Sequence, residues 1–161
     1  MQKNVQSTQH QNLIQKALDT VLELEYTIEE QATELANSFY QQRLEIQSQA
    51  QEEENTQALI ENRIPKRIFC QLHLSARMNR ATLELYWHTV YFVKLTKKKK
   101  YKYISKGKSD AYDMRTLLSK AHPFERDLIK ETEEQAAIIR LQWKKLIEAR
   151  KPLHRLRELS K

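Results

Sequence analysis

The sequence predicts a mainly helical α+β protein. We expect a long N-terminal helix, a three-stranded antiparallel β-meander, a short helix, and a long C-terminal helix packed against the first. Apolar residues recur at alternating spacings of four and three over residues 10–50, and the period changes to two between residues 68 and 105. One glycine and three prolines among 161 residues leave few breaks in regular structure.

The N-terminal segment, residues 10–50, has the apolar stripe of a coiled-coil helix, interrupted by Glu25 and Gln42. At 1.5 Å per residue this segment spans about 60 Å, which is too long for a small sheet to cover. We therefore expect the stripe to lie on the C-terminal helix, on the same helix of a second chain, or on a partner protein. The candidate contact residues are Ile14, Leu18, Val21, Ile28, Leu35, Phe39 and Ile46.

Residues 68–105 have the period of β-strands. The alternation from Ile68 to Arg77 predicts a half-buried strand, and residues 77–80 are predicted as the turn. A second strand is predicted over residues 82–95, because β-branched and aromatic residues dominate it. Lys97 to Lys100 are predicted as the loop of a hairpin and residues 101–105 as the returning strand. The predicted apolar face of the second strand consists of Leu83, Leu85, Trp87, Tyr91 and Val93.

Two helices are predicted after this meander. The first runs from Ala111 to Ala121 with Asp110 as its N-cap. Pro123 begins the second, because its missing N–H costs nothing in a first turn. Basic residues on one face of the second helix either extend a DNA-binding surface or pair with carboxylates of the N-terminal helix, and we favour the pairing. These basic residues are Arg140, Lys144, Lys151 and Arg155.

Charge is divided unevenly along the chain. Residues 1–62 have a net charge of −8 and residues 63–161 one of +15. This division separates an acidic coiled-coil-like helix from a basic domain, although we expect the two to form one folded unit. The basic part is suited to a polyanion, whereas the alternative is that the acidic and basic parts neutralise each other. Seven lysines lie between residues 95 and 110, a density that nearby carboxylates cannot neutralise.

This lysine-rich hairpin is a candidate DNA-binding element. A two-stranded ribbon fits a DNA groove, and lysines at its tip and edges reach phosphates on both sides. Tyr101 and Tyr103 add stacking groups between the lysines, and Arg77 and Arg80 at the first turn are suited to guanine edges. The alternative is that the lysines protect an edge hairpin from aggregation. The candidate DNA-binding residues are Arg77, Arg80, Lys94, Lys97, Lys98, Lys99, Lys100, Tyr101, Lys102, Tyr103, Lys106 and Lys108.

The sequence gives little support for catalysis, a metal, a cofactor or a membrane segment. The five histidines lack metal-ligand spacing, and one glycine cannot make a phosphate loop. The single cysteine, Cys70, excludes an internal disulfide and favours a reducing compartment. No apolar run approaches the roughly 18 residues of a membrane span, so we expect a cytoplasmic protein. We expect His73 and His88 to be surface residues.

Three segments resemble the MobI-type conjugative transfer proteins of integrative conjugative elements and A/C-type plasmids. They are LELYWHTVYFVK, YKYISKGKSDAYDMRTLLSKA and HPFERDLIKETEEQAAIIR, within residues 70–145. The resemblance implies a non-catalytic auxiliary factor that binds double-stranded DNA at the origin of transfer. It also implies the relaxase or another transfer protein as a partner, and a homodimer is a further alternative.

Other functional classes stay open at this point. The chain could be a coiled-coil adaptor or structural protein whose lysines only confer solubility. It could also be a small nuclease or relaxase, although the sequence has no motif for either. An RNA ligand is a further alternative, because lysines on a ribbon do not distinguish the two nucleic acids.

Overall fold

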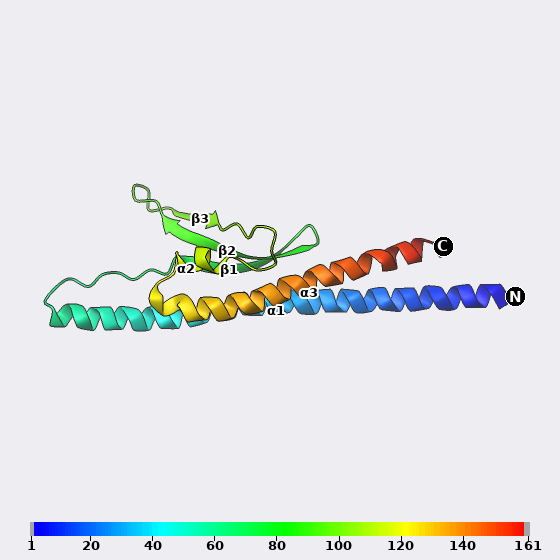
Figure 1. Cartoon of the computed structure of the whole chain (residues 1–161), viewed down its shortest axis with the longest axis horizontal. Coiled ribbons are helices and arrows are strands. Elements are labelled where there is room, and N and C mark those ends of the chain that lie inside the picture. Colours follow the sequence, from blue (N-terminus) through cyan, green and yellow to red (C-terminus); the bar gives the residue numbers. More distant parts are fainter. Residues whose placement is uncertain (1, 160–161) are drawn as a thin grey trace.

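The computed structural model describes the backbone of residues 2–159 and the side chains of residues 8–159. The two long helices lie side by side and antiparallel, and the three-stranded sheet covers one side of the pair (Figure 1). This arrangement confirms the predicted fold class. In chain order the elements are α1 (Gln2–Ile60), β1 (Leu72–Asn79), β2 (Thr82–Phe92), β3 (Lys99–Tyr103), α2 (Met114–Leu118), the 3-10 turn η1 (Pro123–Glu125) and α3 (Arg126–Leu159).

The apolar stripe of α1 packs against α3 and the sheet within the same chain. Ile28, Ala32 and Phe39 belong to one hydrophobic core with Ile139 and Trp143 of α3. Of the three alternatives for the stripe, the structure therefore shows the first, contact with the C-terminal helix. Among the predicted contact residues, Leu18, Val21, Ile28 and Phe39 are buried, whereas Ile14, Leu35 and Ile46 are partly buried.

Two expectations about polar contacts of the long helices are wrong. The stripe does not continue through Gln42, which is exposed, but through the buried Arg43, because α1 there faces β1. Arg43 donates hydrogen bonds to the carbonyl oxygens of Cys70 and Leu72, at 2.9 and 3.4 Å. Arg43 therefore ties α1 to the start of β1 through the backbone of the strand.

The favoured pairing of α3 cations with α1 carboxylates is also wrong for the residues that we named. Arg140 pairs with Glu133 of its own helix, and Lys144 pairs with Asp110 before α2. The face of α3 that carries them is turned toward the sheet and the β3–α2 loop, so α1 is out of their reach. An ion pair that does join the long helices connects Arg150 to Glu25, at 2.8 Å.

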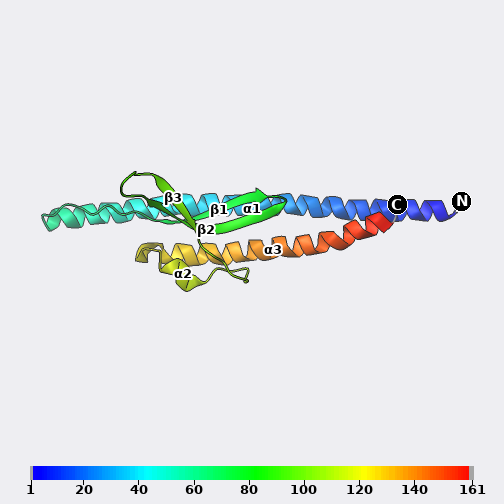
Figure 2. The same ribbon diagram turned by 90° about the horizontal axis from the view of Figure 1, so that it is seen from above.

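The sheet has the order β1-β2-β3 and is antiparallel throughout. Seen from above, β1 lies over α1, and α2 lies beside α3 (Figure 2). Trp87 of β2 packs edge-to-face on Phe39 of α1, with ring centroids 4.9 Å apart. β1 and β2 are joined by a two-residue turn at Arg80 and Ala81, whose φ angles are +47° and +62°.

The strand bounds differ from the prediction at both ends of β1, at the end of β2 and at both ends of β3. β1 continues to residue 79, through most of the predicted turn at 77–80, and β3 ends at residue 103 instead of 105. β1 begins at Leu72, because Gln51 of α1 binds the backbone of Lys66 and Ile68 and holds that segment outside the sheet. β2 ends at Phe92, where its register pairs it with Lys99. The third strand therefore starts at residue 99, two residues earlier than predicted, and Lys99 and Lys100 belong to a strand instead of a loop.

The predicted apolar face of β2 is also incorrect near its end. Tyr91 is 43 % exposed, because β1 pairs with β2 only as far as Thr89 and the strand continues beyond the core. Val93 lies after the strand and is only partly buried. Leu83, Leu85 and Trp87 are buried as predicted.

The short helix is shorter than predicted and begins later. Asp113, not Asp110, is its N-cap, and its side chain accepts a hydrogen bond from the Thr116 backbone N–H at 3.0 Å. Residues 110–112 are not helical because their backbone bonds to α3 side chains: the Asp110 carbonyl accepts from Arg140, and the Tyr112 N–H donates to Glu133. Among the described residues, no helix is both long enough and apolar enough to span a bilayer.

Candidate nucleic-acid interface

The outer face of the sheet carries a cluster of aromatic rings. Side chains alternate along a strand, so Tyr86 and His88 share the outer face of β2. The register places Tyr103 of β3 opposite His88 on one side and His73 of β1 opposite it on the other. Tyr101 lies on the same face of β3, two residues before Tyr103. The cluster therefore runs across all three strands.

The rings of this cluster are in contact with one another. The ring centroids of Tyr86 and Tyr103 are 5.2 Å apart, those of His73 and His88 are 5.5 Å apart, and those of His88 and Tyr101 are 5.6 Å apart. Tyr101 and Tyr103 are 57 % and 60 % exposed, whereas His88 is only 6 % exposed. In this cluster the His88 ring is therefore buried, and the rings of Tyr101 and Tyr103 are open to solvent.

Both histidines of the cluster are neutral near pH 7. Arg43 Nη1 lies 2.9 Å from His73 Nε2, and because a guanidinium can only donate, this nitrogen accepts the hydrogen bond. Burial, reinforced by the Arg43 charge, lowers the pKa of His73 to about 3. Burial also lowers the pKa of His88, with Lys99 contributing. The expectation that these histidines are surface residues is wrong for His88, which is buried, whereas His73 is partly buried.

The predicted lysines lie along β3 and on the segments that flank it. Lys99, Lys100 and Lys102 are in the strand, with Lys99 on the aromatic face and its ammonium 5.6 Å from the Tyr101 ring centroid. The remaining predicted lysines are Lys94, Lys97 and Lys98 before β3 and Lys106 and Lys108 after it. All are exposed except Lys106, which is partly exposed. No carboxylate of the described chain lies within ion-pair distance of any of them.

The two predicted base-contacting arginines differ in their surroundings. Arg77 Nε donates to Glu84 Oε2 at 2.6 Å, and its guanidinium lies 5.1 Å from the Tyr86 ring centroid. Hydrogen bonds from Asn79 and Arg77 lower the pKa of the Glu84 carboxyl group. Arg80 is exposed at the tip of the β1–β2 turn and makes no ion pair with the described residues. Only Arg80 is thus available without breaking an intramolecular contact.

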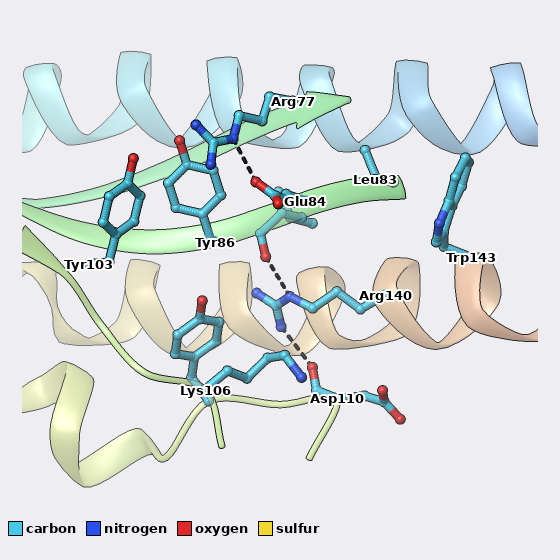
Figure 3. Close-up of a pocket in the computed structure, with 11 residues that line it drawn as sticks. Arg77, Leu83, Glu84, Tyr86, Tyr103, Lys106, Asp110, Arg140 and Trp143 are labelled. Carbon is cyan, nitrogen blue, oxygen red and sulfur yellow. Dashed lines mark hydrogen bonds and ion pairs between the residues drawn. The ribbon is translucent and has the colours of Figure 1, made fainter. Parts of the chain in front are cut away.

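Two hollows lie along the aromatic face, and a third adjoins them at the unpaired edge of β2. The first, of about 370 Å³, lies between α1 and the sheet and includes His88, Lys99 and Tyr101 in its walls. The second, of about 240 Å³, is lined by Ser75, Tyr86, His88, Tyr101 and Tyr103. The third, of about 500 Å³, includes Tyr86 and Tyr103 together with Arg77, Lys106 and Arg140 (Figure 3). The first and second hollows share Ser75, His88 and Tyr101, and the second and third share Tyr86 and Tyr103, so the three adjoin one another in one continuous track.

A buried polar network forms the far wall of the third hollow. β3 pairs only with residues 88–92 of β2, so the backbone edge of β2 is unpaired nearby. Arg140 satisfies part of this edge, because its Nε donates to the Leu85 carbonyl at 2.7 Å (Figure 3). The same guanidinium forms a two-fold ion pair with Glu133, which also accepts from Trp87 Nε1 at 2.6 Å. This network holds the β3–α2 loop against α3.

The described residues offer no arrangement for metal binding. In the part of the chain with placed side chains, no three His, Cys, Asp or Glu residues form a group that could hold a metal ion. Burial raises the pKa of the Cys70 thiol to about 12, so the thiol stays protonated and unreactive at neutral pH.

Sequence reasoning identified the tyrosines of β3 but missed the ring cluster beneath them. Tyr86, His73 and His88 all lie on the predicted outward face of their strands, and that alternation was the available signal. The missing information was the register, because only the pairing of His88 with Tyr103 brings the rings of three strands together. Arg43 was missed because a single arginine in a long helix carries no signal of burial.

Comparison with known protein families gives a match. The family model described as MobI protein matches residues 28–154, which include the whole sheet and the candidate interface. No curated protein and no solved structure matches the chain.

Proposed function

The chain belongs to the MobI protein family, and from this premise we propose that it is a DNA-binding accessory protein of conjugative transfer. It recognises double-stranded DNA at the origin of transfer and assists the relaxase without catalysing a step itself. The protein contacts phosphates through the lysines of residues 94–108 and base edges through Arg80. Family membership supports the role in transfer, and the distribution of charge supports the contact with DNA.

The observation that carries the proposal is that the lysines around β3 have no carboxylate partner among the residues whose side chains the structure describes. The acidic residues of α1 do not reach them, although α1 supplies a partner for Arg150 of α3. Lys100 and Lys102 project from one face of β3 and Lys99 from the other, while Lys97 and Lys98 are in the loop. A duplex phosphate backbone is the kind of ligand that neutralises such a set of ammonium groups.

A partner protein fits a different part of the molecule. Much of the apolar stripe of α1 is covered by α3. Apolar side chains on the other faces of the N-terminal half of α1 are exposed, among them Leu13, Leu22, Leu24 and Tyr26. These side chains support a contact with the relaxase or another transfer protein, at a distance from the lysines. The competing function, an adaptor whose lysines only confer solubility, would use this surface alone.

The test is a titration of the purified protein with duplex origin DNA and with a random duplex at several salt concentrations. If five or six lysines contact phosphates, the logarithm of affinity falls against the logarithm of salt concentration with a slope of about −5. Replacing Lys97, Lys98, Lys99 and Lys100 by Gln weakens binding and makes this slope shallower by about 3 to 4.

The matched control carries the same change of charge elsewhere. Its four substitutions are Lys16→Gln, Lys120→Gln, Lys130→Gln and Lys145→Gln, all outside the segment 94–108. The control keeps the affinity and the slope of the unmodified protein. A slope near zero for the unmodified protein, or an equal loss in both variants, would exclude the proposed role of the lysines.

A further inference from the structure

We propose that the aromatic face of the sheet binds an unpaired, single-stranded segment of DNA, with bases stacked on Tyr101 and Tyr103. This inference rests on the proposed function, because it requires DNA at the lysine-bearing strand β3. It goes further by naming the form of DNA that the face accepts. The protein then contacts duplex phosphates through its lysines and, beside them, a segment of melted strand through its rings.

The spacing of the two exposed tyrosines argues against a stacked duplex as their ligand. Tyr101 and Tyr103 are two residues apart on one strand, so their attachment points are separated by about 6.6 to 6.8 Å. Stacked bases of a duplex are separated by about 3.4 Å. Consecutive bases can therefore each cover one tyrosine ring only when the strand is unstacked and extended. Such stacking on aromatic side chains is how proteins commonly hold single strands.

The continuous track gives an extended strand a path across the face. Its first hollow is bordered by Lys99 and its third by Lys106, so a lysine without an ion-pair partner among the described residues stands at each end. Arg77 and Glu84, which also line the third hollow, pair with each other. The tyrosine rings stand between these cations, at the walls that the hollows share. A cationic groove with interleaved aromatic rings has the two properties that single-strand binding needs, attraction for the backbone and platforms for the bases.

An unsatisfied polar atom points to a ligand at the same place. Nδ1 of His88 is buried and has no hydrogen-bond partner among the described residues, although the His88 side chain lines two of the three hollows. A buried polar atom without a partner is costly and uncommon in a native protein. The polar edge of an inserted base would supply the missing hydrogen bond.

The test compares the affinity for a labelled oligothymidylate of about twelve nucleotides, within the usual size of such sites, with that for a random duplex. Tyr101→Leu combined with Tyr103→Leu keeps apolar bulk but removes the stacking rings. We expect this variant to bind the oligothymidylate about tenfold or more weakly and the duplex as the unmodified protein does. Tyr101→Phe combined with Tyr103→Phe keeps the rings and retains both affinities.

Tyr26→Leu is the matched control, because Tyr26 is equally exposed but lies on α1. It changes neither affinity, and thermal unfolding shows whether each variant is folded. If the folded Leu double variant binds the oligothymidylate as well as the unmodified protein, the inference is wrong. A clearly higher affinity of the unmodified protein for oligouridylate than for oligothymidylate would also overturn it, in favour of RNA.

The lysine variant separates this inference from the proposed function. If the four Lys→Gln substitutions weaken the binding of both probes while the tyrosine substitutions weaken neither, only the single-strand inference fails. If the lysine substitutions leave duplex binding unchanged, the proposed function fails.

Discussion

Two regions of basic residues in this protein have opposite surroundings. Arg43, Arg140 and Arg150 on the long helices are each bound to groups within the chain. The lysines of residues 94–108 are solvated and make no ion pair with the described residues. The net charge of a sequence does not distinguish these cases. The contacts of each side chain do: these three guanidinium groups have fixed internal partners, whereas the ammonium groups of the lysines stay hydrated.

The position of the lysine-bearing strand depends on the internal arginines. Arg140 holds the segment that follows β3 through the Asp110 carbonyl, and Arg43 holds the segment that precedes and begins β1. The internal arginines thus fix the sheet at two places, while the lysines project from its third strand. Changes in the first region should therefore affect stability, and changes in the second should affect binding.

The largest effect on stability is expected at Glu133. Its carboxylate accepts hydrogen bonds from Arg140, Trp87 Nε1 and the Tyr112 N–H, and it is almost fully buried. Glu133→Ala leaves the Arg140 charge buried without its partner, so we expect the free energy of unfolding to fall by about 3 to 5 kcal/mol. Urea denaturation followed by circular dichroism measures this loss.

Lys144→Ala is the control for this comparison. Lys144 pairs with Asp110 at 3.6 Å, but half of its side chain is exposed, so the loss should stay below about 1 kcal/mol. Equal losses of unfolding free energy in the two variants would show that the buried ion pair contributes no more to stability than the exposed one.

The second effect is a loss of stability in mild acid, caused by the partly buried His73 and the buried His88. His73 and His88 both have a folded pKa below the usual 6.5, so below that pH the unfolded chain binds more protons than the folded one. Their stabilising contribution is complete above pH 6.5 and is lost as the pH falls toward about 3. Between pH 7 and pH 5 we expect a decrease of about 1 to 3 kcal/mol in the free energy of unfolding.

His73→Gln identifies the source of this pH dependence. Glutamine does not titrate, so the decrease between pH 7 and pH 5 should be smaller than in the unmodified protein by half or more. Carboxylates such as Glu54, whose pKa hydrogen bonds from Arg63 lower to about 2, lose their contribution mainly below pH 5. An unchanged slope in the His73 variant would assign the effect to other groups.

The fold was largely predictable because its elements have strong local signals. The stripe of α1 has a helical period over many turns, and β2 has dense β-branched and aromatic content. The errors lie where tertiary contacts decide the local structure. Gln51 keeps residues 66–68 out of the sheet, and the hydrogen bonds of Asp110 and Tyr112 to α3 delay the start of α2.

The candidate interface was predictable only in part. A cluster of lysines is visible in any sequence, as are two tyrosines interleaved with it. The contacts of His73, His88 and Tyr86 required the register of three strands, and one residue of slip would move every ring to the other face. The difference between internally paired arginines and solvated lysines depends on tertiary contacts that the sequence does not reveal. One of them is the ion pair between Arg140 and Glu133, in which both charged groups are buried.

The smallest effect concerns the β1–β2 turn, where a strained backbone and a free cation are adjacent. Ala81 has a φ of +62°, in the region that glycine adopts without cost. Ala81→Gly relieves this strain, and the gain is partly offset because glycine gives the unfolded chain more conformational freedom. We expect the free energy of unfolding to rise by about 0.5 to 1 kcal/mol.

Arg80→Gly relieves a similar strain at φ +47° but removes the exposed guanidinium. Thermal melts and origin titrations on the two variants should therefore give similar gains in stability, with reduced affinity for origin DNA only in the Arg80 variant. Equal affinities would remove Arg80 from the interface and leave the lysines as its cationic part.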